Sequence, residues 1–481
     1  MTPVRRLART LASPGALVWT LVALLTIRPQ GDLDYWWHLR IGEWITSHGE
    51  VPRTALLTWL STGPWTAHEW ASEVVLYELH QVTGPFGSIA LFGAVTIAIF
   101  IVMASVMRLL RPTMRALSVA LFGLVAAFVA TAIWLPRAQL FDILFSLAAL
   151  RIALGYLERG ERRGLWLMPL VMVAWVNLHG GGVATYLLVM AAIVAGEWWN
   201  RRTGSSTPRS WRPLLLSIGA TVLAMSLNPY GPSIYTYPFG TVASPAMQAL
   251  IQEWRSPDFH ELYFRFAQVF LAGGLVGLLA LVRVRDGRAI ALTAGLVFMF
   301  LQSGRYVGLL APLGVAVMSP WLAEAVGVLR TGLPRITLRA RWPHPVGLVG
   351  VMVLLASLVV GMPVRQADVV AANEPVAATD WLVVHPPAGR LLNDYNWGGY
   401  LAYRLRIDVG PYGAADAFGD AGLQELRALM DLSADPRSYL DDHAVAAVII
   451  APGQPLDRWF GDAAGWRQVY ADSVAVIYER G

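Results

Sequence analysis

Residues 12–39 of the chain have the sequence ASPGALVWTLVALLTIRPQGDLDYWWHL. The first half is an apolar run of the kind that enters a membrane, and the second half places Asp32 and Asp34 beside three aromatic side chains. Carboxylates at the point where a helix leaves a bilayer cannot pack into an apolar core. We therefore expect them to be solvated, to cap a helix, or to act on a molecule held at the lipid surface.

The composition is typical of a polytopic membrane protein. Hydrophobic residues make up 56% of the 481 positions, charged residues only 14%, and the mean hydropathy is +0.50. The net charge of +5 comes from arginines in short loops between apolar runs, so it reflects topology and indicates no nucleic-acid partner. The absence of cysteine excludes disulfides and thiolate metal sites. Residues 28–30 lack a small-residue cleavage site, so the first apolar run is expected to remain as a span.

The apolar runs predict a polytopic α-helical membrane domain of about 11 spans over residues 1–362. The runs lie near 12–27, 87–107, 116–135, 138–157, 165–178, 181–198, 213–227, 266–282, 289–303, 306–328 and 346–362.

The arginine clusters between the runs predict the topology. Short arginine-rich loops stay in the cytoplasm, so an even number of crossings separates one cluster from the next. This makes helical hairpins of three stretches, 116–157, 165–198 and 289–328. We therefore expect a cytoplasmic N-terminus and three segments outside, namely 28–86, 228–263 and 363–481.

The tips of the three hairpins carry basic residues. They are Arg137, His179 and Arg305. An arginine at membrane depth costs on the order of 2.5–3.5 kcal/mol unless it faces protein, water or a ligand. We expect these side chains and the acidic cluster to meet at the level of the outer leaflet, and this expected convergence is the main indication of a site.

The first outer loop, 28–86, is predicted to contain two helices near 34–47 and 67–82. Its tryptophans and acids would suit helices that lie in the headgroup layer with solvated carboxylates. Alternatively, the acids form a site, because neighbouring carboxylates can share a cation or supply a general base. The candidate metal ligands are then Asp32, Asp34 and Glu69, and the candidate substrate-binding residues are His38, His68 and Glu69.

The second outer loop contains Glu253 and Arg255. These two residues are interpreted either as an ion pair at the rim or as a substrate contact.

Residues 363–481 have the composition of a water-soluble domain. Alternating strands and helices predict a small C-terminal α/β domain. The expected strands are 388–393, 444–451, 466–470 and 473–479, and the expected helices lie near 374–384, 397–405, 421–431 and 436–442.

One segment of this domain, 393–400, passes from a strand end through polar residues to a glycine-led helix. It contains the candidate substrate-binding residues Asp394, Tyr395 and Trp397. Its glycines would either expose backbone amides to an anion or peptide, or form a tight turn with packed aromatic side chains.

Four segments together resemble a group of bacterial integral-membrane proteins of the GT-C glycosyltransferase superfamily. They are 32–39 (DLDYWWHL), 177–181 (NLHGG), 228–231 (NPYG) and 394–400 (DYNWGGY). Segment 394–400 is also similar to the Trp-Trp-Asp-Tyr-Gly signature of oligosaccharyltransferase catalytic subunits, from which it differs by placing Tyr395 and Asn396 before the tryptophan.

The resemblance implies transfer of a sugar from a polyprenyl-phosphate-linked donor to a glycan, lipid or protein acceptor at the outer face of the bacterial cytoplasmic membrane. Asp34, or Asp32, would be the acidic-motif carboxylate and the base, with a divalent cation such as Mg²⁺ or Mn²⁺ as a possible cofactor. Arg137, Arg305 and His179 would bind the donor phosphate.

Two other functions are consistent with the pattern. A carrier or flippase would line its pathway with the outward polar residues, although the paired inverted halves of many transporters are not evident. A non-catalytic scaffold would keep the fold and bind a partner through its outer domain.

Overall fold

The computed structural model describes residues 13–60, 62–131, 133–205, 209–281, 286–331 and 344–481. The chain divides into two compact units. We call the first the helical unit, which comprises residues 1–28, 89–238 and 253–363. The second, the α/β unit, comprises residues 29–88, 239–252 and 364–481.

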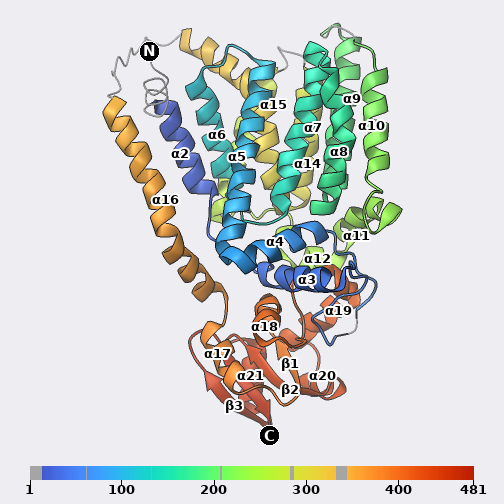
Figure 1. The fold of residues 1–481 in the computed structure, drawn as a ribbon, viewed down its shortest axis with the longest axis vertical. Coiled ribbons are helices and arrows are strands. Elements are labelled where there is room, and N and C mark those ends of the chain that lie inside the picture. Colours follow the sequence, from blue (N-terminus) through green and yellow to red (C-terminus); the bar gives the residue numbers. More distant parts are fainter. Residues whose placement is uncertain (1–12, 61, 132, 206–208, 282–285, 332–343) are drawn as a thin grey trace. The chain divides into compact units, whose positions relative to one another are not determined.

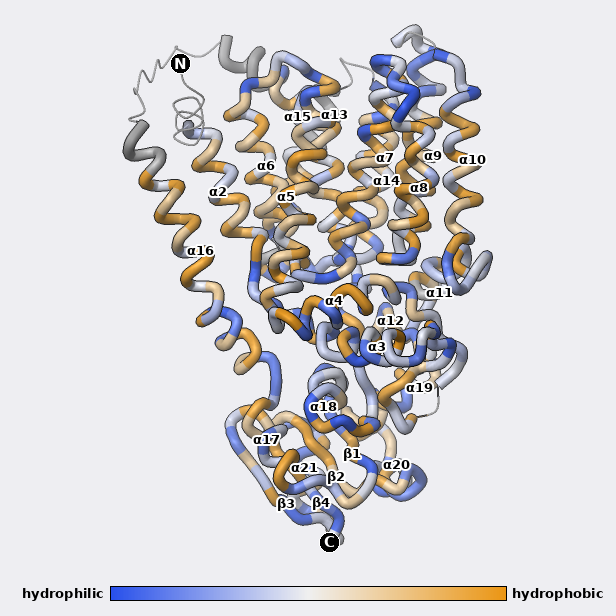
Figure 2. Tube along the Cα trace, in the orientation of Figure 1, coloured by the Kyte–Doolittle hydropathy of each residue, from blue (hydrophilic) through white to orange (hydrophobic). Residues whose placement is uncertain are grey.

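Each of the predicted apolar runs coincides with a helix in the described part of the chain. The helices are α2 (Pro14–Thr26), α5 (Pro85–Leu110), α6 (Ala116–Ala130), α7 (Gln139–Arg159), α8 (Arg162–Leu178), α9 (Gly182–Arg202), α10 (Arg212–Ala224), α13 (Leu262–Leu281), α14 (Gly287–Gln302), α15 (Val307–Thr331) and α16 (His344–Asn373). In the helical unit they run side by side as a bundle (Figure 1), and apolar residues dominate along them (Figure 2).

Five stretches of helix among the described residues are long and apolar enough to cross a membrane. They are Pro85–Leu110, Gln139–Arg159, Gly182–Arg202, Gly304–Glu324 and Val349–Asn373. Together with the shorter apolar helices, they make the chain a mostly helical, multi-pass membrane protein. The total of eleven spans and their orientation stay predictions.

Close packing in the bundle depends on small residues. Helices α9 and α14 pack together, and a Cβ atom at Gly196 would collide with the backbone of Gly287 and Arg288. Because lipid offers no hydrophobic drive for helix association, such close backbone contact is a main source of stability in membrane bundles.

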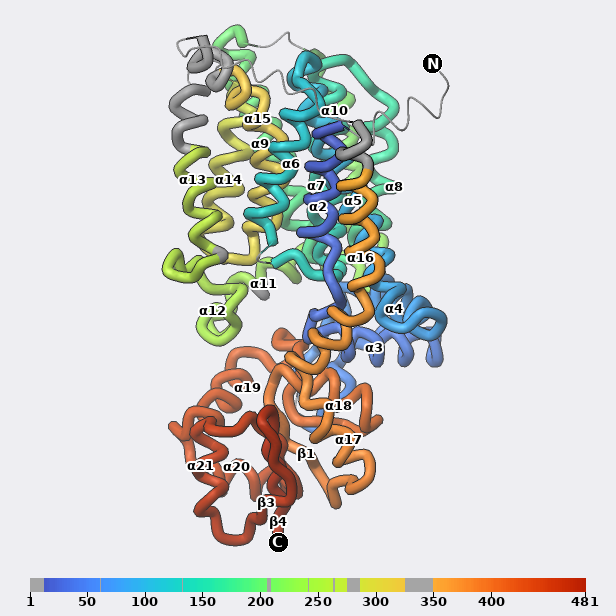
Figure 3. The backbone as a smooth tube through the Cα atoms, turned by 90° about the vertical axis from the view of Figure 1, so that its left-hand side faces the viewer, coloured from blue at the N-terminus to red at the C-terminus, as the bar shows by residue number. Residues whose placement is uncertain are grey.

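The α/β unit contains a four-stranded sheet in the order β1-β2-β4-β3. The strands are β1 (Arg390–Asn393), β2 (Val445–Ile450), β3 (Trp466–Ala471) and β4 (Val476–Arg480). Strands β1 and β2 are parallel, and the other two pairs are antiparallel. In Figure 3 the strands lie between the pair α20 (Pro436–Asp442) and α21 (Pro455–Asp462) and the pair α17 (Val376–Val384) and α18 (Gly398–Leu405).

The predicted small α/β domain is therefore present, with two differences in detail. Helix α21 was not predicted. Helix α19 (Ala415–Met430) begins six residues before the predicted 421–431, and it is kinked at Gly419, whose φ is 63°. Gly419 provides the left-handed backbone conformation that the kink requires.

The two helices predicted in 28–86 are present as α3 (Tyr35–His48) and α4 (Trp70–Thr83). They cross closely, because a Cβ atom at Gly42 would collide with the backbone of Glu73. Residues 57–59 add to the sheet region through backbone hydrogen bonds with Val409, which itself bridges to Leu391 of β1. Hence the first loop and residues 364–481 form one compact unit.

Asn393 connects the end of β1 to the 409–413 segment. It is fully buried, and its amide donates to the carbonyl oxygens of Asp394 and Pro411 at 2.8 Å each. Its side-chain oxygen accepts the N–H of Gly410 at 2.8 Å. One side chain thus satisfies three backbone groups that would otherwise be buried without partners.

Replacing Asn393 with alanine is expected to destabilise the α/β unit by about 2–3 kcal/mol, because it leaves buried backbone groups unpaired. Thermal unfolding of the purified full-length protein, followed by tryptophan fluorescence, would measure the effect. Asn396→Ala is the matched control, since Asn396 is exposed three residues away. Equal unfolding midpoints for the two variants would contradict the assigned role of Asn393.

Candidate functional site

The carboxylate of Asp34 lies at the start of α3 but does not cap it. Asp34 occupies the N-cap position, yet its side chain makes no capping hydrogen bond. Instead, the indole N–H of Trp37 donates to Oδ1 at 2.8 Å. Of the roles considered for this residue, helix capping is therefore excluded, and the indole holds the carboxylate in a defined orientation.

The loop containing Gly413 packs directly against this carboxylate. A Cβ atom at position 413 would collide with Oδ1 of Asp34 and with Nε1 of Trp37. Gly399, on α18, also approaches Trp37, because a Cβ atom at position 399 would lie 3.1 Å from Cδ1 of the indole. Glycines on two elements thus let the backbone approach the Asp34–Trp37 pair closely.

Asp32 is buried, and its Oδ1 lies 3.4 Å from the N–H of Asp34. Its own N–H donates to Oε1 of Gln30, and its carbonyl oxygen accepts the N–H of Tyr35. Asp32 therefore shapes the turn into α3 from which Asp34 projects.

Tyr395 joins the same environment from the other end of the chain. Burial, together with the nearby carboxylates of Asp34 and Asp416, raises the pKa of the Tyr395 phenol well above its usual range. The phenol therefore stays neutral and can donate a hydrogen bond. Asp416 in turn accepts the indole N–H of Trp65 at 3.1 Å. Two residues proposed from the sequence, Asp34 and Tyr395, are brought together, and Asp416 is an addition to them.

The other residues of segment 393–400 build a tight turn. Asp394 accepts the N–H of Asn396 at 3.0 Å through Oδ1, and the side chain of Gln454 at 3.2 Å through Oδ2. Trp397 is buried, and a Cβ atom at Gly398 would collide with the carbonyl of Pro411. These contacts explain the glycines by close packing, and substrate binding by Asp394 and Trp397 stays a prediction.

A second polar cluster connects α3 and α4. Nδ1 of His38 lies 2.9 Å from Glu73 and Nε2 lies 3.5 Å from Glu69, while His68 lies 3.3 Å from the other oxygen of Glu69. Burial alone would lower the pKa of His38, but the carboxylates of Glu69 and Glu73 outweigh it and raise the pKa to about 9. The sequence prediction missed Glu73. The four-residue spacing of Glu69 and Glu73 on one helix face was the available signal.

In the helical unit, Arg137 and Arg305 converge on one carboxylate. Nη1 of Arg137 lies 3.3 Å from Glu253, and the guanidinium of Arg305 lies 4.2 Å from the centre of the Trp254 ring. Burial would raise the pKa of Glu253, but Arg137 and Arg305 together hold it below its usual value. Two cations near the ends of two hairpins thus stabilise the same carboxylate.

His179 is held by a residue that the sequence prediction missed. Its Nδ1 lies 2.9 Å from Oδ2 of Asp142, whose Oδ1 accepts the indole N–H of Trp175 at 2.7 Å. Asp142 is buried in the first turn of α7. A Cβ atom at Gly182 would collide with the Trp175 indole, so the glycines after His179 allow this packing. An acid within an apolar helix was the signal that could have identified Asp142.

Comparison with known proteins identifies the fold. No family model and no curated protein matches the sequence. Among solved structures, ArnT from Cupriavidus metallidurans in the apo state is 16% identical, with a TM-score of 0.53 over 99% of this chain and 98% of that chain. The same protein bound to undecaprenyl phosphate is 18% identical, with a TM-score of 0.50 over 96% of each chain. The Archaeoglobus fulgidus oligosaccharyltransferase is 10% identical, with a TM-score of 0.54 over 91% of this chain and 69% of that chain.

Both neighbours are GT-C glycosyltransferases, and the chain has a GT-C-like fold. The predicted resemblance is confirmed at this level. At such low sequence identities, the structural similarity establishes the fold alone.

The charged state of His38 predicts a pH-dependent stability. Its pKa rises from 6.5 to about 9 on folding, so its contribution is complete below pH 6.5 and is lost as the pH rises through 9. We expect the unfolding free energy to fall by up to about 3 kcal/mol over this interval.

Unfolding midpoints of the purified protein between pH 6 and 9.5 would measure this loss. In His38→Gln the decline should be largely absent. His48→Gln, which changes an exposed histidine on the same helix, should retain it. The same slope in both variants would show that His38 does not cause the decline.

Proposed function

We propose that this protein, whose fold is GT-C-like, is a glycosyltransferase that moves a sugar from a polyprenyl-phosphate-linked donor to an acceptor. The fold supports the reaction class, and one structural neighbour was solved bound to undecaprenyl phosphate. The observation on which the proposal mainly depends is the Asp34 carboxylate, which is oriented by Trp37, not used as a cap, and close to the neutral phenol of Tyr395.

In the proposed reaction Asp34 acts as the general base. It takes the proton from an acceptor hydroxyl or amide as the acceptor atom forms a bond to the anomeric carbon of the sugar. The bond between that carbon and the phosphate oxygen breaks, and polyprenyl phosphate leaves with the electron pair. Attack from the face opposite the phosphate inverts the anomeric centre.

The leaving phosphate needs positive charge. Arg137 and Arg305 are proposed to supply it, because guanidinium groups contact two phosphate oxygens at once and stay charged in an apolar environment. Glu253 neutralises one of the two cations in their present arrangement. His179, held by Asp142, is the third proposed phosphate ligand.

The residues partly fit a divalent cation. The oxygen ligands Asp32 and Asp34 are of the type that Mg²⁺ and Mn²⁺ prefer, and when bound the cation would supply charge stabilisation there. One oxygen of Glu69 faces His38, which keeps its proton, so Glu69 would bind a cation only through the other oxygen, beside His68. No step of the proposed reaction depends on the cation.

The proposed acceptor contacts are His38, His68, Glu69, Glu253, Asp394, Tyr395 and Trp397. The arginine distribution supports a cytoplasmic N-terminus, a C-terminal domain outside the bacterial cytoplasmic membrane, and therefore transfer at the outer face.

Asp34→Asn is expected to reduce sugar transfer by 10²–10⁴-fold, because the amide cannot accept the acceptor proton. Release of polyprenyl phosphate from a panel of labelled polyprenyl-phosphate sugars, in membranes that contain the variant, would measure transfer whichever acceptor the protein uses.

Glu50→Gln, which changes an exposed acid in the same loop, should be fully active. Full activity of Asp34→Asn would remove this residue from the mechanism. If transport rather than transfer is the function, movement of a labelled lipid-linked substrate should survive the Asp34 change.

Substitutions in the arginine cluster are expected to change donor-lipid binding in opposite directions. Arg305→Ala should weaken binding of undecaprenyl phosphate by about tenfold or more, because a charge-assisted contact is lost. Glu253→Gln should strengthen it a few-fold, because a competing carboxylate is removed.

Titration of the purified variants with undecaprenyl phosphate in nanodiscs would measure both effects. Arg265→Ala, at an exposed position in the first turn of α13, is the control. An unchanged affinity in Arg305→Ala would restrict Arg305 to a structural role.

A further inference from the structure

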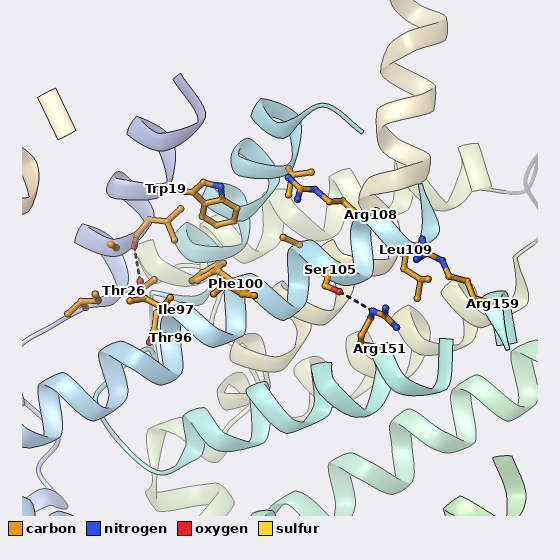
Figure 4. A pocket seen from close by; sticks show the side chains of 16 residues that line it. Trp19, Thr26, Thr96, Ile97, Phe100, Ser105, Arg108, Leu109, Arg151 and Arg159 are labelled. Atoms are coloured by element: carbon orange, nitrogen blue, oxygen red, sulfur yellow. Dashed lines mark hydrogen bonds between the residues drawn. The ribbon is translucent and has the colours of Figure 1, made fainter. Parts of the chain in front are cut away.

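A cavity of about 600 Å³ lies in the helical unit, between α2, α5, α6 and α7 (Figure 4). Its walls are mainly apolar, and they include Trp19 of α2, Phe100 of α5 and Val119 of α6. A cavity of this volume and character is of the size that binds a small amphiphile or part of a lipid chain.

One region of the cavity is strongly basic. Arg108 in the last turn of α5 and Arg159 in the last turn of α7 line it, together with Arg151 (Figure 4). Arg151 lies eight residues before Arg159, about 12 Å further into the bundle at 1.5 Å per residue. A charge at such a depth is costly unless it has a function or a partner.

Arg151 is held in place by neighbouring groups. Its Nε donates to the hydroxyl of Ser105 at 3.0 Å, and its Nη1 to Glu161 at 2.9 Å. A Cβ atom at Gly155 would collide with Nη1 of Arg151, so the glycine makes room for the guanidinium. Arg151 is therefore oriented along the cavity wall, with 25% of its side chain exposed.

The acidic groups nearby do not neutralise this region. Glu161 is shared between Arg151 and Arg159, and Arg108 has no acidic partner among the described residues. By contrast, Arg288 contacts the three acids Glu158, Glu197 and Asp286. The positive-inside rule accounts for an excess of arginines at the cytoplasmic ends of helices, but it does not require that three of them line one apolar cavity.

We propose that this cavity binds an anionic glycerophospholipid, with the phosphate at Arg108, Arg151 and Arg159 and one hydrocarbon chain against α2 and α5. Guanidinium groups match phosphate oxygens, and the apolar walls match the chain. A bilayer phospholipid is favoured as the source because the arginine distribution places this end of α7 at the cytoplasmic leaflet, which is rich in anionic lipid.

This site is separate from the proposed donor site. Arg137 precedes α7, and Arg159 is the last of its 21 residues, so the two arginines are about 30 Å apart along the helix. The inference therefore does not depend on the proposed function.

Native mass spectrometry of the full-length protein with phosphatidylglycerol, phosphatidylcholine or undecaprenyl phosphate would test the proposal. We expect phosphatidylglycerol to bind at least tenfold more tightly than phosphatidylcholine. The double variant Arg108→Gln/Arg159→Gln should lose at least tenfold in affinity for phosphatidylglycerol. Both arginines are exposed or half-exposed, so folding should be retained.

Two further variants make the test specific. Arg162→Gln/Arg163→Gln removes exposed arginines that do not line the cavity and should bind phosphatidylglycerol as the unmodified protein does. Ala104→Phe fills the apolar part of the cavity and should prevent binding.

Three results would overturn the proposal. They are wild-type affinity in the Arg108→Gln/Arg159→Gln variant, equal binding of phosphatidylcholine, and displacement of phosphatidylglycerol by undecaprenyl phosphate at equal concentration. The last result would assign the cavity to a polyprenyl lipid.

Discussion

A charged side chain beside an apolar helix costs free energy unless a partner or a ligand offsets it, and this constraint organises both units of the protein. In the helical unit Arg137 pairs with Glu253, whose carboxylate is also stabilised by the charge of Arg305, and His179 lies beside Asp142. In the α/β unit His38 lies between Glu69 and Glu73. A charge pair restricts where the helix that carries the charge can lie. The polar contacts therefore help to define how the helices pack, together with the contacts between apolar side chains.

The helices were predictable because hydropathy is a local property. Every apolar run from 12–27 to 346–362 coincides with a helix. Turn residues and alternating patterns predicted where α3, α4 and most elements of the α/β unit lie along the sequence. Helix α21 was missed because its eight residues mix aromatic, acidic and basic side chains, and its burial against the sheet is a tertiary effect. The strand order β1-β2-β4-β3 could not be predicted, since several pairings suit the same four segments.

The candidate site was only partly predictable. Asp34 and the arginines were predicted because they lie at the ends of apolar runs, where charges are costly, and because the resemblance to GT-C proteins includes an acidic motif. The proximity of Asp34 to Tyr395 joins residues 361 positions apart, a separation across which no local pattern provides information. Asp416 was missed for the same reason, because its partner lies on another element. Glu73 and Asp142 did carry local signals, namely the four-residue spacing from Glu69 and an acid within an apolar helix, which the prediction did not use. The roles of Gly413 and Gly399 could be assigned only from the structure, because the sequence does not show which residues their backbones approach.

The groups around Asp34 differ in how they respond to acidity. The Trp37 indole does not ionise, and the Tyr395 phenol keeps its proton, whereas His38 loses its charge near pH 9. Between acidic and neutral pH, none of these three groups therefore changes its protonation state. Of the three groups, only His38 responds to the medium, and it does so only when the medium becomes alkaline.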